Sequence, residues 1–275
     1  MKRMCLKKYF VIATSCMAGV FSTSAQITSE VFSVNVVGFH NVAVPPSDVG
    51  GGMQLMGVPF DAEPGTLDQV VGTSGVAADN ALSADNIILF DPEAAPGSEY
   101  RRFYLRNNPD NNDEPMWRFA GTPQYWATNE FLYPNDGFWY VNRASESVTN
   151  LLSGNVVNIP EVTVTIVPGL QLLSYPFSAP ASLHEMGLTN GIAAPNALSA
   201  DNITLYDPTL PPGDQYIRYY LRPNPDDNNT PMWRFAGIPQ TWATNVVIQP
   251  HQGFWYHSRA EEPFDWIVQR PYLLD

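Results

Sequence analysis

Cysteine is almost absent from this sequence, and its position limits what it can do. The 275 residues include two cysteines, Cys5 and Cys16. Both lie in a stretch typical of a secretory signal, with a basic start, an apolar run from Phe10 to Phe21 and small residues before the expected cleavage after Ala25. The exported chain would then contain no thiol, which excludes disulfides and cysteine chemistry.

A lipoprotein signal cut before Cys16 is the alternative for this stretch. Such a signal needs a large aliphatic residue three positions upstream, where this chain has Ala13. No apolar run reaches the ~18 residues of a membrane-spanning helix. We therefore expect a protein that is secreted, periplasmic or at the cell surface after cleavage, with no membrane span.

Lysine is missing after the signal, and positive charge is scarce. Four of the 14 basic residues lie in residues 1–25, which leaves ten, all of them arginine. Against 27 acidic residues this gives the exported chain a net charge of 10 − 27 = −17. Such a chain repels phosphate backbones, which argues against nucleic acid as a partner.

The chain does contain a long internal repeat. Asn80–Tyr140 recurs as Asn196–Tyr256 at a constant offset of 116 residues, with NALSADNI, PMWRFAG and GFWY in both copies. This pattern indicates two copies of one structural unit. We expect a signal peptide at 1–25, repeat one at 26–158 and repeat two at 159–275.

Short strands dominate the pattern of both copies. Apolar residues alternate in stretches such as Tyr100–Arg106, Asp-Pro and Pro-Gly pairs end them, and turn signals recur every ~8–12 residues. A short helix is expected at most around Leu67–Val71. The sequence predicts an all-β fold with two tandem copies of a small β-sandwich or barrel-like unit. The copies are expected to pack together or to exchange an edge strand.

The most specific pattern is a strand in which tyrosine and arginine alternate. It reads YRRFYLR in repeat one and YIRYYLR in repeat two. Because side chains alternate across a strand, Phe103 and Leu105 share one face. The opposite face, the Tyr/Arg face, carries Tyr100, Arg102, Tyr104 and Arg106 in repeat one, and Tyr216, Arg218, Tyr220 and Arg222 in repeat two.

This Tyr/Arg face allows two interpretations. It could bind a polyhydroxylated or anionic glycan, with the rings as stacking platforms and arginine for planar, bidentate contacts. It could also be scaffold, in which arginine stacks on tyrosine for ~0.5–1 kcal/mol per exposed contact. The tyrosines and arginines occur in both copies, which favours the scaffold interpretation, because residues that maintain the fold must recur in every copy.

The loops that follow these strands, NPDNND and NPDDNN, are the best metal candidate. Calcium loops alternate oxygen ligands in a similar way. The candidate ligands are Asn108, Asp110 and Asn112 in repeat one, and Asn224, Asp226 and Asn228 in repeat two. The glycine of calcium loops is missing, so a polar hairpin loop without an ion is the alternative.

Catalytic motifs are missing: the sequence has no GxSxG, no HExxH and no glycine-rich phosphate loop. No histidine has a histidine at the equivalent position of the other copy, and we expect His251 and His257 to form a surface pair on the last hairpin. A glycoside-active enzyme would need paired carboxylates. The acids that recur are Asp85/Asp201, Asp91/Asp207 and Asp110/Asp226, and we expect them to serve turns and caps.

The order of motifs is familiar. A chain with SVNVVGFHNVAVP, then LQLLSYPF, YIRYYLR and QPHQGFWYHSR resembles uncharacterised secreted β-repeat proteins of verrucomicrobial-type bacteria. The resemblance implies an envelope or extracellular protein and transfers no catalytic residue. We expect a non-enzymatic interaction module whose partner is a polysaccharide or an envelope protein, with a structural, self-assembling envelope component as the alternative.

Overall fold

The computed structural model describes residues 36–63 and 65–272, which fold almost entirely into antiparallel strands. The strands of repeat one are β1 (Val37–Val44), β2 (Met53–Gly57), β3 (Phe60–Asp61), β4 (Asn86–Phe90), β5 (Tyr100–Asn108), β6 (Glu114–Phe119), β7 (Gly137–Val141) and β8 (Val148–Val156). Those of repeat two are β9 (Glu161–Ile166), β10 (Gly169–Ser174), β11 (Ala181–Ser182), β12 (Asn202–Tyr206), β13 (Tyr216–Asn224), β14 (Thr230–Phe235), β15 (Val247–Ile248), β16 (Gly253–Ser258) and β17 (Phe264–Gln269).

In residues 36–63 and 65–272, helix is limited to two short pieces, the 3-10 turn η1 (Gly50–Gly52) and α2 (Leu67–Val70). In α2, Thr66 and Gln69 form a capping box that supplies partners for free backbone groups of the first turn. No helix among the described residues has the length and apolar character to cross a membrane. The all-β prediction is confirmed, whereas the predicted signal at 1–25 lies outside the described residues.

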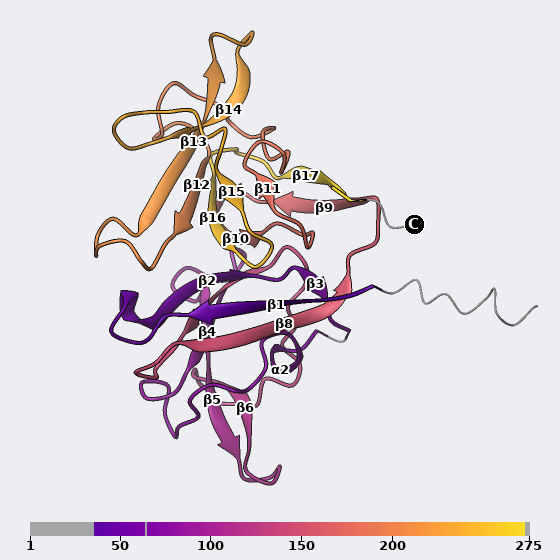
Figure 1. Ribbon diagram of the computed structural model, residues 1–275, viewed down its shortest axis with the longest axis vertical. Coiled ribbons are helices and arrows are strands. Elements are labelled where there is room, and N and C mark those ends of the chain that lie inside the picture. The colour runs from indigo at the N-terminus through magenta and orange to yellow at the C-terminus, as the bar shows by residue number, and fades with distance from the viewer. Residues whose placement is uncertain (1–35, 64, 273–275) are drawn as a thin grey trace, which may run out of the picture. The chain divides into compact units, whose positions relative to one another are not determined.

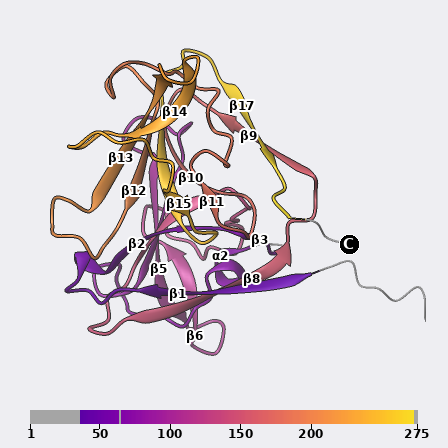
Figure 2. The ribbon, with the colours of Figure 1, turned by 45° about the horizontal axis from the view of Figure 1, so that its top comes forward.

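The two repeats have the same strand order. One five-stranded sheet runs β2-β7-β4-β5-β6 and the other runs β10-β16-β12-β13-β14, so each strand has a counterpart at the same place. The first strand of each repeat pairs with the last strand of the same repeat, β1 with β8 and β9 with β17 (Figures 1 and 2). The described strands therefore exclude the exchange of an edge strand. The sandwich or barrel-like closure and the boundary at 158 stay predictions.

Alternation along β5 explains how each sheet acquires a core face. Phe103 and Leu105 are fully buried, and Leu105 lies opposite Trp117 of β6. The Trp117 indole donates a hydrogen bond of 3.0 Å to the carbonyl oxygen of Gly72, so its polar atom is satisfied inside the core. Repeat two places Leu221 opposite Trp233 in the same register.

The outer faces of the two sheets pack together within Val37–Asp275, which form one compact unit. Two isolated bridges join the repeats, Met56 with Gln252 and Asp136 with Leu173. An apolar cluster of buried side chains from both repeats lies beside them: Leu55, Trp139, Leu172 and Tyr206. This packing brings β5 and β13 to the border of a common cavity.

Candidate functional site

The Tyr/Arg face divides half-way along its strand. Tyr100 and Tyr216 are 58% and 53% exposed, and Arg102 and Arg218 are also exposed. Farther along the strand the chain covers the face, so that the next tyrosine of each repeat, Tyr104 and Tyr220, is buried, and Arg106 and Arg222 are half-buried.

A local cluster of small side chains explains the burial of this second tyrosine. In repeat two, Tyr220 packs with Ala194 and Ala200 of the segment that precedes β12. The Tyr220 hydroxyl accepts a hydrogen bond of 3.1 Å from Arg222. The second half of the Tyr/Arg face is therefore scaffold, and a continuous Tyr-Arg-Tyr-Arg binding ladder is wrong.

The first half of the face borders the main cavity, which has a volume of about 590 Å³. Ligand pockets in proteins span roughly 300–1,000 Å³, so the space suits a small ligand. Repeat one contributes Met53, Ile88, Tyr100 and Trp139, and repeat two contributes Leu170, Asn202, Thr204, Tyr216, Arg218, Trp255, His257 and Arg259.

Aromatic rings from both repeats frame this cavity in two equivalent clusters. Trp255 of repeat two packs edge-on against Phe90 of repeat one, with ring centroids 5.0 Å apart, and Phe90 contacts Tyr100 at 5.1 Å. The equivalent Trp139 packs against Tyr206 at 4.8 Å. Edge-to-face packing of this kind fixes ring orientation. The recurring tryptophans of GFWY thus hold the repeats together and form the cavity wall.

The polar part of the wall comes from three neighbouring strands of repeat two. The register sets Thr204 of β12 between Arg218 of β13 and Trp255 of β16. Two residues earlier in β12, Asn202 pairs with His257 of β16. Alternation then places all these side chains on the same face of the sheet, toward the cavity.

A buried carboxylate supports this wall from below. Asp201 is fully buried and accepts hydrogen bonds from the Tyr256 hydroxyl at 2.6 Å and from the backbone N–H of Arg259 at 2.5 Å. Asp85 does the same for Tyr140 and Arg143 in repeat one, at 2.8 and 2.7 Å. The expectation that these acids serve a local turn or cap is wrong, because their partners lie far away in sequence.

The other recurring acids lie on separate segments. Asp91 and Asp207 accept local hydrogen bonds from Glu93 and Thr209 in turns, as expected, while Asp110 is exposed in a hairpin loop. Within the part of the chain that the structure describes, none of the residues that line the cavity is acidic. This arrangement gives a carboxylate-pair mechanism no support.

His257 titrates in a positively charged setting. Burial lowers its pKa below the usual value, and the guanidinium groups of Arg259 and Arg218 lower it further, while the carboxylate of Asp201 acts in the opposite direction. The imidazole is therefore neutral at neutral pH and can donate or accept a hydrogen bond. His251, expected beside it, contacts His40 of β1, with ring centroids 5.7 Å apart.

The candidate calcium loops use their first asparagine for their own fold. The Asn108 side-chain oxygen accepts a hydrogen bond of 3.0 Å from the backbone N–H of Asp110, and Asn224 does the same for Asp226 at 3.1 Å. Asn112 and Asn228 have positive φ values of 51° and 48°, which suits tight hairpin turns. The described residues contain no group of three or more His, Cys, Asp or Glu side chains placed to hold a metal ion.

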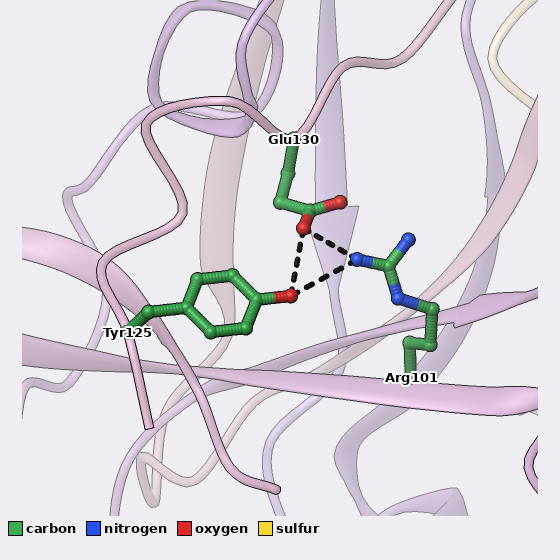
Figure 3. Close-up of polar contacts among 3 residues, drawn as sticks. All are labelled: Arg101, Tyr125 and Glu130. Carbon is green, nitrogen blue, oxygen red and sulfur yellow. Dashed lines mark hydrogen bonds and ion pairs between the residues drawn. The ribbon is translucent and has the colours of Figure 1, made fainter. Parts of the chain in front are cut away.

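A third polar cluster belongs to repeat one alone. Figure 3 shows the Arg101 guanidinium and the Tyr125 hydroxyl converging on one carboxylate oxygen of Glu130. The Tyr125–Glu130 bond is 2.8 Å, and Arg101 also donates to the Tyr125 oxygen at 3.1 Å. The three groups satisfy one another, so the cluster ties β5 to the loop between β6 and β7.

Sequence reasoning identified Tyr100, Tyr216 and Arg218 of the cavity wall but missed its other polar residues. The missed ones are Asn202, Thr204, His257 and Arg259, together with Trp139 and Trp255. One available signal was divergence: Thr204 and His257 stand where repeat one has Ile88 and Val141.

No protein-family model, no curated protein and no solved structure matches this chain.

Proposed function

We propose that this protein is a secreted or envelope-associated, non-enzymatic module that binds a glycan in the cavity between its repeats. One observation carries the proposal: two tryptophans and two tyrosines line the same cavity as arginine, asparagine and threonine side chains. Sugar rings present apolar C–H faces that pack on aromatic rings, and their hydroxyls need hydrogen-bond partners around the edge.

Aromatic and polar side chains at the cavity both reach solvent, the polar ones being Arg218 and Arg259. Tyr100 and Tyr216 are more than half exposed, while Phe90 and Tyr206 hold the neighbouring tryptophans. Little reorganisation is therefore needed on binding, which limits the entropic cost. A polysaccharide is the partner class that this arrangement supports best.

The test is binding to an array of polysaccharides, followed by calorimetry on those retained. Tyr216→Ala is expected to weaken binding about tenfold or more and to leave the melting temperature within a few degrees. Tyr133→Ala is the matched control, since Tyr133 is 57% exposed and does not line the cavity. Retention of no polysaccharide, or equal losses in both variants, would reject the proposal.

A second candidate, a self-assembling envelope component, is favoured by one surface. Among the described strands β1 is at an edge of the sheet β1-β8-β3. Val37 and Phe39 of β1 are 70% and 68% exposed, and Leu151 of β8 is 53% exposed. An exposed apolar edge strand is a template for pairing with a second copy. Sedimentation equilibrium would show concentration-dependent oligomers that Phe39→Lys abolishes, and a monomer at all concentrations would reject this candidate.

A further inference from the structure

Charge is distributed unusually around the cavity. The chain has 27 acidic and 14 basic residues. Among the described residues that line the cavity, however, the charged side chains are Arg218 and Arg259, His257 lies beside them, and none is acidic. The ion pairs among the described residues are Arg101–Glu130 and Arg106–Asp79. Neither cavity arginine is thus neutralised by a carboxylate of the described chain, and both remain available to an anion.

Comparison of the repeats separates what the fold needs from what the cavity needs. Repeat one has the same strand order and the same register, but it carries Ile88 and Val141 where repeat two has Thr204 and His257. Apolar residues at these positions are compatible with the sheet, so folding alone does not explain the hydroxyl and the imidazole. Both residues line the cavity and give its repeat-two side polar groups, whereas repeat one contributes the apolar Ile88 from the position equivalent to Thr204.

The scaffold also fixes one of the arginines. The backbone N–H of Arg259 donates to the buried Asp201 carboxylate, which also accepts from the Tyr256 hydroxyl. The main chain at the cavity border is therefore held in place while the Arg259 side chain is exposed. A guanidinium on a fixed backbone loses less freedom on binding an anion than one on a mobile loop.

We propose that repeat two forms a binding site for an acidic sugar, in which Arg218 and Arg259 contact its carboxylate or sulfate group. His257 and Thr204 bind the neighbouring hydroxyls, while the buried Asn202 donates its amide to the carbonyl oxygens of Ala197 and Ala200 and so supports the wall. Guanidinium groups bind oxyanions through paired, charge-assisted hydrogen bonds to two oxygen atoms, and Trp255 offers an aromatic surface for the sugar ring. The inference rests on the proposed glycan function and specifies its ligand class and its repeat.

The site also predicts a pH dependence. The groups that act on His257 are Arg218 from β13, Arg259 after β16 and Asp201 before β12. A bound anion would offset the two arginines and favour the imidazolium form. Binding should therefore take up a proton and become stronger as the pH falls from 8 to 6.

Calorimetry on the exported chain tests this with three probes: an oligogalacturonate for carboxylate, a sulfated galactan oligosaccharide for sulfate, and a cello-oligosaccharide as the neutral ligand. We expect one acidic probe to bind at least tenfold more tightly than the neutral one, with an affinity that falls as salt is added. The acidic probe that binds identifies the group. If the neutral probe binds as tightly as the acidic probes or more tightly, the ligand is not an acidic sugar, but the proposal of a glycan-binding cavity stands. If none of the three probes binds, both proposals are rejected.

Matched variants locate the site. Arg218→Gln should weaken acidic-probe binding about tenfold, whereas Arg102→Gln, the equivalent change in repeat one outside the cavity lining, should stay within about twofold. The double variant Thr204→Ile with His257→Val introduces the residues of repeat one and should remove the pH dependence while the melting temperature is kept. Equal losses in the two arginine variants, or an unchanged pH dependence in the double variant, would overturn the assignment to repeat two.

Discussion

The backbone N–H of Ser174 in repeat two donates a hydrogen bond of 2.8 Å to the carbonyl oxygen of Asn135 in repeat one. At the equivalent positions the donor and acceptor repeats are exchanged: the backbone N–H of Gly57 in repeat one donates to the carbonyl oxygen of His251 in repeat two, also at 2.8 Å. Each repeat therefore contacts the other through the same two positions, as the subunits of a symmetric dimer do. Duplication of one chain segment could produce such an interface only if the outer face of the unit was self-complementary.

Close packing at Gly57 depends on the missing side chain. A Cβ atom at Gly57 would lie 2.4 Å from the Cβ of Ser174, so Gly57→Ala should destabilise the protein by ~2 kcal/mol through overpacking. Adding Ser174→Gly, which removes the clashing atom, should recover part of this loss. Denaturant unfolding measures both changes. A Gly57→Ala variant as stable as the parent protein would show that the repeats do not pack this closely.

Asp136 should make stability depend on pH. Burial raises its pKa to about 6, although the hydrogen bond from the Tyr133 N–H acts in the opposite direction. Between about pH 4 and 6 the folded chain holds a proton that the unfolded chain releases, so stability falls as the pH rises through this window. Asp136→Asn keeps the acceptor for Tyr133 and should gain up to about 2 kcal/mol over the parent between pH 4 and 7. The prediction is wrong if the unfolding free energies of Asp136→Asn and the parent protein change in parallel with pH.

The histidine pair should act in the opposite pH direction. Burial lowers the pKa of both His40 and His251, and the charge of His40 lowers that of His251 further. The unfolded chain therefore binds protons more readily, and the stability present above about pH 6.5 is lost as the pH falls. His251→Asn, which introduces the residue of repeat one, should reduce this acid sensitivity, measured as melting temperature from pH 7.5 to 5. An acid sensitivity in His251→Asn equal to that of the parent protein would contradict this prediction.

The cluster in Figure 3 should show coupling between its members. Glu130→Val removes the shared acceptor of Arg101 and Tyr125 and should cost about 1 kcal/mol, because the half-buried guanidinium loses its carboxylate. Arg101→Ile with Glu130→Val recreates the apolar pair Ile217 and Val246 of repeat two. A double-mutant cycle should find the double variant more stable than the sum of the two single losses. Simple additivity would mean that the cluster contributes nothing.

Local sequence pattern determined the strands and the core face of this protein. Alternation predicted that Phe103 and Leu105 share one face of their strand, and both are fully buried. The internal repeat predicted two similar units, and the strand orders of the two sheets agree. These predictions succeed because side-chain direction along a strand depends only on local backbone geometry.

Only the tertiary structure decided which of the outward-facing residues reach solvent and which meet across the repeats. Tyr100 and Tyr104 have the same orientation in the pattern, yet one is exposed and the other is buried, because what covers a strand comes from elsewhere in the chain. Trp255 meets Phe90 more than 160 residues away in sequence. Such contacts depend on how two folded faces pack, and strand periodicity carries no information about that packing.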